Sequence, residues 1–379
     1  MAIDNKDKKI LNVPLLRFPE FSGEWEMVSL QDIATINPKS DPLQNTFIYI
    51  DLEAVEKGEL RKIQEIMREE APSRAQRVID NNDILFQCVR PYQKNNYIHR
   101  ILNTSNQQWV ASTGYAQIRT TELPNYIYHL LNTDEFNRKV MVRCTGSSYP
   151  AINSEDLATI HFYYTPDKKE QLKISRLLDL LDKRIATQNK IIEKLQSLIK
   201  GLRVCCMQRV YGNNVYLSEI AQIYQPQTIS STELTEDGFL VYGANGIIGK
   251  YKDYNHETEQ ICITCRGNTC GMVNYTKPMS WITGNAMVIN TDKYQDKVCK
   301  RYLYHYLSAY NFNSIISGSG QPQIVRTPLE KLKITLPTIS EQKQKAIIFD
   351  KIQDKIDINH KVLNLYIGQK QYLLRQMFI

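Results

Sequence analysis

Cys262 and Cys265, with Cys270 close behind, form the arrangement in this chain that most resembles a metal site. A C-x-x-C pair commonly binds zinc when a second pair supplies the remaining ligands. Residues 260–265 have the composition of a β-strand, in which side chains three positions apart point to opposite faces. No second pair follows in the sequence. We therefore interpret these cysteines as reduced, packed thiols and expect no metal.

Glycine-rich residues 243–250 resemble a phosphate-binding loop in composition but not in spacing. Five residues instead of four separate Gly243 from Gly249, and Tyr251 stands where that motif needs Ser or Thr for magnesium. The chain also lacks the Asn-Pro-Pro-Tyr or Asp-Pro-Pro-Tyr loop that holds a flipped base for amino methylation, and Pro166-Asp167 is not followed by the Glu-x-Lys of restriction-type nucleases. We therefore expect a chain that is not an enzyme and binds no cofactor itself.

Two histidines occur in similar contexts, His129 in Tyr-Ile-Tyr-His-Leu-Leu and His305 in Tyr-Leu-Tyr-His-Tyr-Leu. A histidine can act as a general base. Their aromatic and aliphatic neighbours in predicted helices favour packing instead, and we interpret both as packing residues.

These hexamers belong to an internal repeat that covers most of the chain. Residues 30–36 return as 217–223, and residues 113–118 return as 283–288. A third set shares single positions: Gly146, Pro150, Ile152 and Leu157 return as Gly318, Pro322, Ile324 and Leu329. Several matches in the same order predict two similar halves.

Each half ends in a long segment with a heptad pattern. Apolar positions alternate in steps of four and three residues over 174–202 and over 349–377, and a shift of 171 residues brings the two series into register. Such spacing keeps one apolar seam toward a partner helix. Gln188 and Asn359 share one seam position, where a buried amide fixes register. We predict that the helices pair with these amides adjacent; separate packing of each helix on its own domain is the alternative.

The fold class that follows is mixed α/β. We expect two similar α/β domains separated by two long helices that form an antiparallel coiled coil, with a pseudo-twofold internal repeat. A helix of about 40 residues is about 60 Å long, which separates the domains at its ends. The predicted segments are an N-terminal segment 1–22, a first domain 23–165, a central helix 166–210, a second domain 211–336 and a C-terminal helix 337–379.

Charge and hydropathy limit the class of protein further. The net charge of +7 is carried by the predicted helices, since residues 1–165 have 18 basic and 21 acidic side chains and residues 211–336 have 11 and 10. The sequence contains no run of about 18 apolar residues, so it predicts no membrane span. The first residues lack the apolar stretch of a signal peptide. We therefore expect a cytoplasmic protein with reduced thiols.

Several segments resemble the specificity subunits of type I restriction–modification enzymes. They are residues 12–19 with Trp25, residues 83–86 and 89–92, residues 242–251, residues 266–268 and residues 284–286. The resemblance spans the whole chain, including both long helices. It implies a non-catalytic subunit in which two target-recognition domains each read half of a bipartite sequence in double-stranded DNA. The helices would then act as a spacer that sets the gap between the half-sites.

The same resemblance implies partner subunits. Two methyltransferase subunits would bind S-adenosylmethionine, and translocase–nuclease subunits would use ATP and Mg²⁺. Two domains on a pseudo-twofold scaffold should read half-sites about one helical turn apart on one side of the duplex.

Base readout needs amides, hydroxyls and arginines that reach into a groove. Candidates in the first domain are Arg74, Arg77, Arg90, Lys94, Ser147, Ser148 and Tyr149. Candidates in the second are Gln225, Gln227, Tyr242, Asn245, Lys250, Arg266, Asn268, Gln321 and Gln323. A solvated surface role is the alternative for each, and the two tyrosines could pack locally. Rival classes are a coiled-coil interaction scaffold that does not recognise DNA and a self-sufficient modification enzyme.

Overall fold

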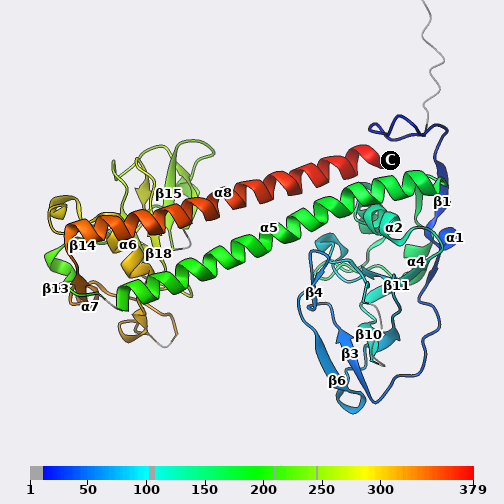
Figure 1. Cartoon of the computed structure of the whole chain (residues 1–379), viewed down its shortest axis with the longest axis horizontal. Helices are drawn as coiled ribbons and strands as arrows, with labels where there is room; N and C mark the ends of the chain where they lie inside the picture. The colour runs from blue at the N-terminus through cyan, green and yellow to red at the C-terminus, as the bar shows by residue number, and fades with distance from the viewer. Residues whose placement is uncertain (1–11, 102–106, 209, 245, 319) are drawn as a thin grey trace, which may run out of the picture. The chain divides into compact units, whose positions relative to one another are not determined.

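The computed structural model describes residues 12–101, 107–208, 210–244, 246–318 and 320–379. The chain divides into two compact units. The first unit comprises Met1–Thr187 with Leu363–Ile379, and the second comprises Gln188–Val362. Each unit therefore consists of a sheet-rich domain and parts of the two long helices α5 (Lys168–Gln208) and α8 (Ile339–Met377) (Figure 1).

The domain of the first unit contains two four-stranded sheets. The first sheet has the order β6 (Gln64–Met67), β3 (Thr46–Ile50), β10 (Gln108–Ser112), β7 (Ala75–Val78), and the second has the order β2 (Ala34–Ile36), β11 (Tyr115–Thr120), β8 (Ile84–Gln87), β9 (Tyr97–Ile98). Only the pair β3–β10 is parallel in these sheets. The remaining strands form two pairs, β1 (Glu26–Ser29) with β12 (His161–Tyr164) and β4 (Val55–Glu56) with β5 (Glu59–Leu60).

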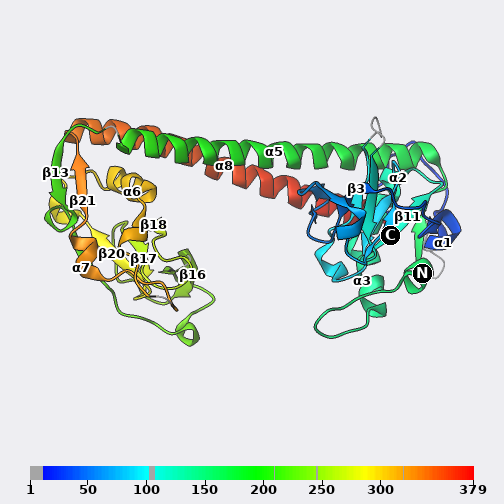
Figure 2. The same cartoon turned by 90° about the horizontal axis from the view of Figure 1, so that it is seen from below.

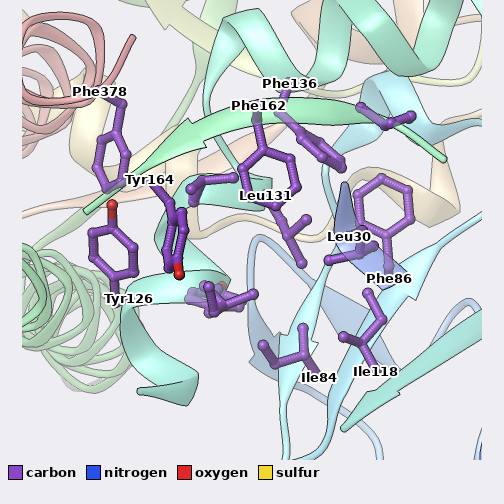
Figure 3. Packing of buried hydrophobic residues seen from close by; sticks show 14 of the residues in the cluster. Leu30, Ile84, Phe86, Ile118, Tyr126, Leu131, Phe136, Phe162, Tyr164 and Phe378 are labelled. Atoms are coloured by element: carbon purple, nitrogen blue, oxygen red, sulfur yellow. The ribbon is translucent and has the colours of Figure 1, made fainter. Parts of the chain in front are cut away.

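Strand β8 is buried on both faces, as its unbroken apolar run predicts. Ile84 and Phe86 face the helices together with Ile118, whereas Leu85 faces the other sheet. The helices are α1 (Leu30–Ile33), α2 (Pro124–Leu131), α3 (Asp134–Arg143) and α4 (Ser154–Ala158), in addition to α5. The main core of the first unit therefore lies between β8 and these helices (Figure 3).

The C-terminal end of α8 belongs to this core. Phe378 packs against Tyr126 of α2 with ring centroids 5.5 Å apart (Figure 3), and its ring centroid lies 6.1 Å from that of Trp25. Leu374 and Met377 of α8 join the same cluster. The first domain is thus completed by a segment that is more than 200 residues away from it in the sequence.

The domain of the second unit repeats this order of elements. Its sheets are β14 (Gln222–Tyr224), β20 (Ala286–Asn290), β17 (Ile261–Thr264), β18 (Val273–Tyr275), and β16 (Gly246–Tyr251), β15 (Phe239–Gly243), β19 (Trp281–Ile282), with β13 (Asn213–Tyr216) paired to β21 (Lys333–Leu336). The pair β15–β19 is parallel, like β3–β10. Helix α6 (Lys300–Ala309) lies between β17, β18 and β20 and the beginning of α8 (Figure 2), and α7 (Arg326–Glu330) precedes β21.

The prediction of two similar α/β domains is confirmed for the elements next to the long helices. Sheet β2-β11-β8-β9 corresponds to β14-β20-β17-β18, the pair β1–β12 to β13–β21, α2 to α6, and α5 to α8. The clearest difference among the described residues is α3, since only the short 3-10 turn Phe312–Ser314 follows α6.

The pairing of the long helices is also confirmed, and it is antiparallel. In the second unit, Ile199 of α5 packs with Phe349 and Ile356 of α8, whereas in the first unit Leu178 clusters with Leu374. The Gln188 Nε2 atom donates to Asn359 Oδ1 at 2.5 Å and to the Asn359 carbonyl oxygen at 3.1 Å. Gln188 is 8% exposed and Asn359 is half-buried, so the two amides form one polar layer in the seam.

Within the ranges that the structure describes, no helix combines the length and the apolarity that crossing a bilayer requires.

Candidate nucleic-acid interface

A tight loop in the first domain, residues 145–151, gathers three of the predicted DNA-contacting residues. Thr145 and Ala151 exchange backbone hydrogen bonds of 2.9 Å in both directions, and Ala151 also bridges to Val89, just after β8. Gly146 has a φ of +90°, and a Cβ there would lie 2.9 Å from the Tyr149 carbonyl oxygen, so the turn requires glycine. The loop is therefore closed on itself and anchored to a central strand. Its middle residues Ser147, Ser148 and Tyr149 are exposed.

Arg90 contacts this first loop through both its backbone and its side chain. Its backbone N–H donates to the Pro150 carbonyl at 2.7 Å, and its guanidinium carbon lies 4.3 Å from the centre of the Tyr149 ring. Tyr149 is 64% exposed, so one face of its ring stacks on Arg90 while the hydroxyl stays available.

A second loop, residues 317–323, has the same construction in the second domain at its described positions 317, 318 and 320–323. Ser317 and Gln323 exchange backbone hydrogen bonds of 2.9 and 2.8 Å, and Gln323 bridges to Arg266, just after β17. Gly318 has a φ of +94°, and a Cβ there would lie 2.4 Å from the Gln321 carbonyl oxygen. The side chains of Gln321, Gln323 and Arg266 are exposed.

Arg266 is the cationic side chain next to the second loop, to which it is bridged through Gln323. An ion pair that positions a loop would be the alternative to DNA contact for this side chain. Over the ranges that the structure describes, its guanidinium forms no ion pair with a carboxylate. Serine, amide, tyrosine and arginine side chains presented in this way match the donors and acceptors of base edges in a DNA groove.

In the first domain, Arg74 directly precedes β7 and Arg77 lies within it. Arg74 is exposed. Arg77 is half-buried, and burial lowers the pKa of its guanidinium. Its Nε has no hydrogen-bond partner among the described residues. A half-buried, unpaired cation would gain a partner from a phosphate or a base acceptor.

Two predicted lysines are engaged within the chain. Lys94 Nζ lies 2.7 Å from Asp134 Oδ1 and donates to the Asn132 carbonyl at 3.2 Å, so it caps the junction between α2 and α3. Lys250 Nζ lies 3.2 Å from Asp237 Oδ1. Both are weaker candidates for DNA contact than the arginines because their charges already have partners.

Tyr242 is buried, which fits the alternative of local packing better than DNA contact. It is 5% exposed, and its hydroxyl accepts a hydrogen bond of 3.1 Å from the Lys277 backbone. Its glycine-rich surroundings suggested a loop, but residues 239–243 form β15 and turn this ring into the core. Gln225 is exposed, yet its amide donates to the Gly284 carbonyl. Gln227 and Asn268 are exposed, and Asn245 lies outside the described residues.

A cavity of about 320 Å³ lies beside the second loop. Its wall contains Met287 and Ile324 together with three polar residues of the candidate set. Those three are Gln225, Arg266 and Gln323. Arg326, which also lines it, was missed from the sequence; it is exposed and pairs with Glu330 at 2.7 Å. Its position directly after the loop was the available signal.

The cysteines considered for metal binding lie on opposite faces of their strand. Cys262 packs with Val288 on one side, and Cys265 packs with Ile324 on the other. Burial raises the pKa of the Cys262 thiol to about 12. Among the residues described, no group of three or more His, Cys, Asp or Glu side chains is placed to hold an ion.

Comparisons with known proteins agree on one family. A family model described as the type I restriction modification DNA specificity domain matches residues 22–197 and 213–365. The chain is 31% identical over 147 residues to the type I restriction enzyme EcoprrI specificity subunit of Escherichia coli, covering 38% of this chain and 36% of the relative. It is 27% identical over 140 residues to a putative type I specificity subunit, S.HindORF215P, of Haemophilus influenzae, covering 35% of each. The chain thus spans about a third of the length of these relatives.

Solved structures show the same fold at low sequence identity. The crystal structure of a type I restriction–modification S subunit from M. genitalium aligns with a TM-score of 0.65 and 16% identity, over 97% of this chain and 99% of that one. A chain from a study of complex assembly and conformational transition of the type I R-M system aligns with a TM-score of 0.57 and 20% identity, over 92% and 96%. Because the family model covers both domains and most of both long helices, this chain belongs to the family of type I restriction–modification DNA specificity subunits.

Proposed function

We propose that this chain selects the DNA target of a type I restriction–modification complex. Each domain would read one half of a bipartite sequence in double-stranded DNA, and partner subunits would methylate or cut the DNA. The observation that carries this proposal is the pair of equivalent loops, 145–151 and 317–323, each anchored to the end of a central strand. The two loops differ in side chains, as two different half-sites require.

The proposed contacts follow from exposure and charge. In the first domain we assign base readout to the first loop with Arg90, and backbone contact to Arg74 and Arg77. In the second domain we assign base readout to Arg266, Asn268, Gln321 and Gln323, with Gln225 and Gln227 at the edge. Lys94, Lys250 and Asn245 remain secondary candidates.

The domain limits predicted from the sequence are part of the proposal. We assign DNA reading to residues 23–165 and 211–336, and the spacer to residues 166–210 and 337–379, after an N-terminal segment 1–22. A seam with one polar layer, formed by a pair of matched amides, supports a spacer that sets the gap between the half-sites.

Two methyltransferase subunits would dock on the spacer helices, supplying S-adenosylmethionine. Large apolar side chains stay exposed there, Leu180 and Leu198 on α5 and Ile358 and Leu365 on α8, with Leu365 72% exposed. Each pair recurs on one helix face, and exposed apolar groups that line up mark protein interfaces. Translocase–nuclease subunits with ATP and Mg²⁺ would join the same complex.

Methylome sequencing tests the proposal. The chain is co-expressed with a methyltransferase subunit of a type I system in a host without other such systems. We expect methylation at one split sequence, and its loss without this chain. Replacing Ser147, Ser148 and Tyr149 together with alanine should change one half-site, whereas Lys62→Ala, on an exposed surface elsewhere in the same domain, should change neither. A complex that assembles but methylates no split site would favour the interaction scaffold.

A matched insertion tests the spacer. Seven residues of heptad pattern are added directly after Gln188 in α5 and directly before Asn359 in α8, so that the seam stays in register. The insertion lengthens each helix by about 10 Å, which corresponds to about three base pairs. We expect both half-sites to keep their bases while the gap grows. An unchanged gap would contradict a ruler.

A further inference from the structure

Each recognition domain is joined to the long helix that follows it by a buried histidine–aspartate contact. In the first unit, the His129 Nε2 atom of α2 lies 2.8 Å from Asp179 Oδ1 of α5. In the second unit, the His305 Nε2 atom of α6 lies 2.8 Å from Asp350 Oδ1 of α8. Both histidines are fully buried. Asp179 and Asp350 are 171 residues apart, which is also the shift that aligns the two heptad series.

The protonation of the second contact follows from its geometry. Arg203 of α5 donates its Nε–H to His305 Nδ1 at 3.1 Å, so Nδ1 is the acceptor and Nε2 carries the proton that bonds to Asp350. Burial lowers the pKa of His305, and burial likewise lowers the pKa of His129. Each contact therefore joins a neutral imidazole N–H to a carboxylate, and its strength depends on direction as well as distance.

Each aspartate also accepts a hydrogen bond from a second side chain of the domain that it contacts. Asp350 accepts from Arg301 Nε at 2.9 Å, and Asp179 accepts from Asn125 Nδ2 at 2.5 Å. Burial by itself would raise the pKa of each carboxyl, but these hydrogen bonds and the histidine lower it overall. Several donors of one domain thus converge on a single ionised side chain of the helix.

Such a cluster costs more free energy of desolvation than apolar packing between the same two helices would. Burying a carboxylate requires desolvation, and well-packed apolar residues of similar volume are often as stable or more stable. Apolar contacts, however, tolerate sliding and rotation, whereas converging hydrogen bonds are satisfied in one orientation only. The same device in both halves, at equivalent positions, points to a requirement that both domains share.

We propose that His129–Asp179 and His305–Asp350 are orientation joints. They fix the rotation of each recognition domain about its spacer helix, and so fix the gap and the helical phase between the two half-sites. His129, Asp179, His305 and Asp350 are positioning residues, since they act through the loops and touch no DNA. The inference rests on the proposed function and adds a geometric requirement to it.

Variants of the second joint test the idea in the assembled complex. Asp350→Ala removes the acceptor, and methylome sequencing should then find the same bases in both half-sites but with gaps one base pair shorter or longer methylated to at least a tenth of the normal level. His305→Gln, made in the parent chain, keeps an N–H for Asp350 and should therefore keep a single gap. Asp354→Ala, one turn further along α8 and exposed, is the matched control and should behave as the parent.

The possible outcomes distinguish failure of the joint from failure of the proposed function. A single unchanged gap in Asp350→Ala overturns the joint while leaving the proposed function intact, and so does altered base preference within a half-site. Absence of split-site methylation in the parent complex would overturn the proposed function itself. If Asp350→Ala fails to assemble, Asp350→Asn keeps the shape and a weaker acceptor. That variant should relax the gap partly, and a strictly single gap in it counts against the joint.

Discussion

The two recognition domains share their frame and differ in the parts that would meet DNA. Both use an antiparallel strand pair beside the long helix, a helix with a buried histidine, and a closed loop on the end of a central strand. In the first domain Asn37 donates to Ser154 Oγ at 2.7 Å behind the loop. In the second, Gln225 and Arg326 stand at the corresponding places and line a cavity. The shared parts attach a domain to the spacer, and the differing parts give each domain its own surface chemistry.

The domains also differ in how the chain completes them. The core of the first takes in the end of α8, with Phe378 packed on Tyr126. The second is built from one continuous stretch, Gln188–Val362. The first domain should therefore be the more sensitive to changes at the C-terminus.

Phe378→Ala should produce the largest effect. Removing a buried phenylalanine costs about 3–5 kcal/mol, here in the first unit alone. Denaturant unfolding should show one of two transitions shifted to lower denaturant. Tyr372→Ala, exposed on the same helix, should stay within about 0.5 kcal/mol of the parent. Equal shifts of both transitions would mean that the two units do not unfold separately.

Arg266→Ala should affect recognition by the second domain. Loss of a bidentate arginine–base contact costs about 1–3 kcal/mol, so methylation should relax at one position of one half-site. The other half-site should keep its sequence because residues 23–165 would read it independently. Uniform loss of methylation would indicate a phosphate contact or a folding defect, and altered specificity in both half-sites would contradict modular reading.

Period-based features were predictable from the sequence, and contacts between distant residues were not. The repeat, the α/β class and the seam with Gln188 and Asn359 follow from spacing alone, because helices and strands impose fixed periods. The buried positions of His129 and His305 followed from their apolar neighbours. Their partners Asp179 and Asp350, 50 and 45 residues further on, gave no local signal.

The candidate interface was predictable only in outline. Gly146 and Gly318 marked both loops, because a turn with positive φ favours glycine. Tyr242 was placed in a loop because its segment is rich in glycine, but the segment forms strand β15. The sequence shows only that Lys94 and Lys250 are basic. Their carboxylate partners become visible in the fold.

Acid should destabilise the first unit through a buried histidine. His99 is fully buried between Tyr97 and Trp109, and burial lowers its pKa to about 4. Between pH 6.5 and pH 4 the unfolded chain binds a proton at this histidine and the folded chain does not, so stability falls as the pH is lowered. The loss from pH 7 to pH 5 should be about 2 kcal/mol. Unfolding at both pH values checks this, and His99→Gln should lose about 2 kcal/mol of the pH dependence, while the share that comes from buried His129 stays; an unchanged pH dependence in that variant would place its source elsewhere.

The smallest effect is expected at the polar layer that the two long helices share. Replacing Gln188 and Asn359 together with leucine removes two amides from an apolar seam and should raise the free energy of unfolding by about 1 kcal/mol. Either single replacement leaves one amide without its partner and should be destabilising instead. Melting temperatures of the double and single variants decide between these signs. A clear drop in the double variant would mean that the layer stabilises the spacer rather than only fixing its register.

The same double variant separates register from stability. Without the amide pair, a heptad slip of one helix along the other leaves no polar group unpaired, so register becomes less strictly defined. A spacer that is more stable yet methylates sites with more than one gap length would show that the amides determine position along the helices. The histidine–aspartate joints would then determine rotation about them. A single gap in the double variant would leave the joints as the only device of the two that sets the gap.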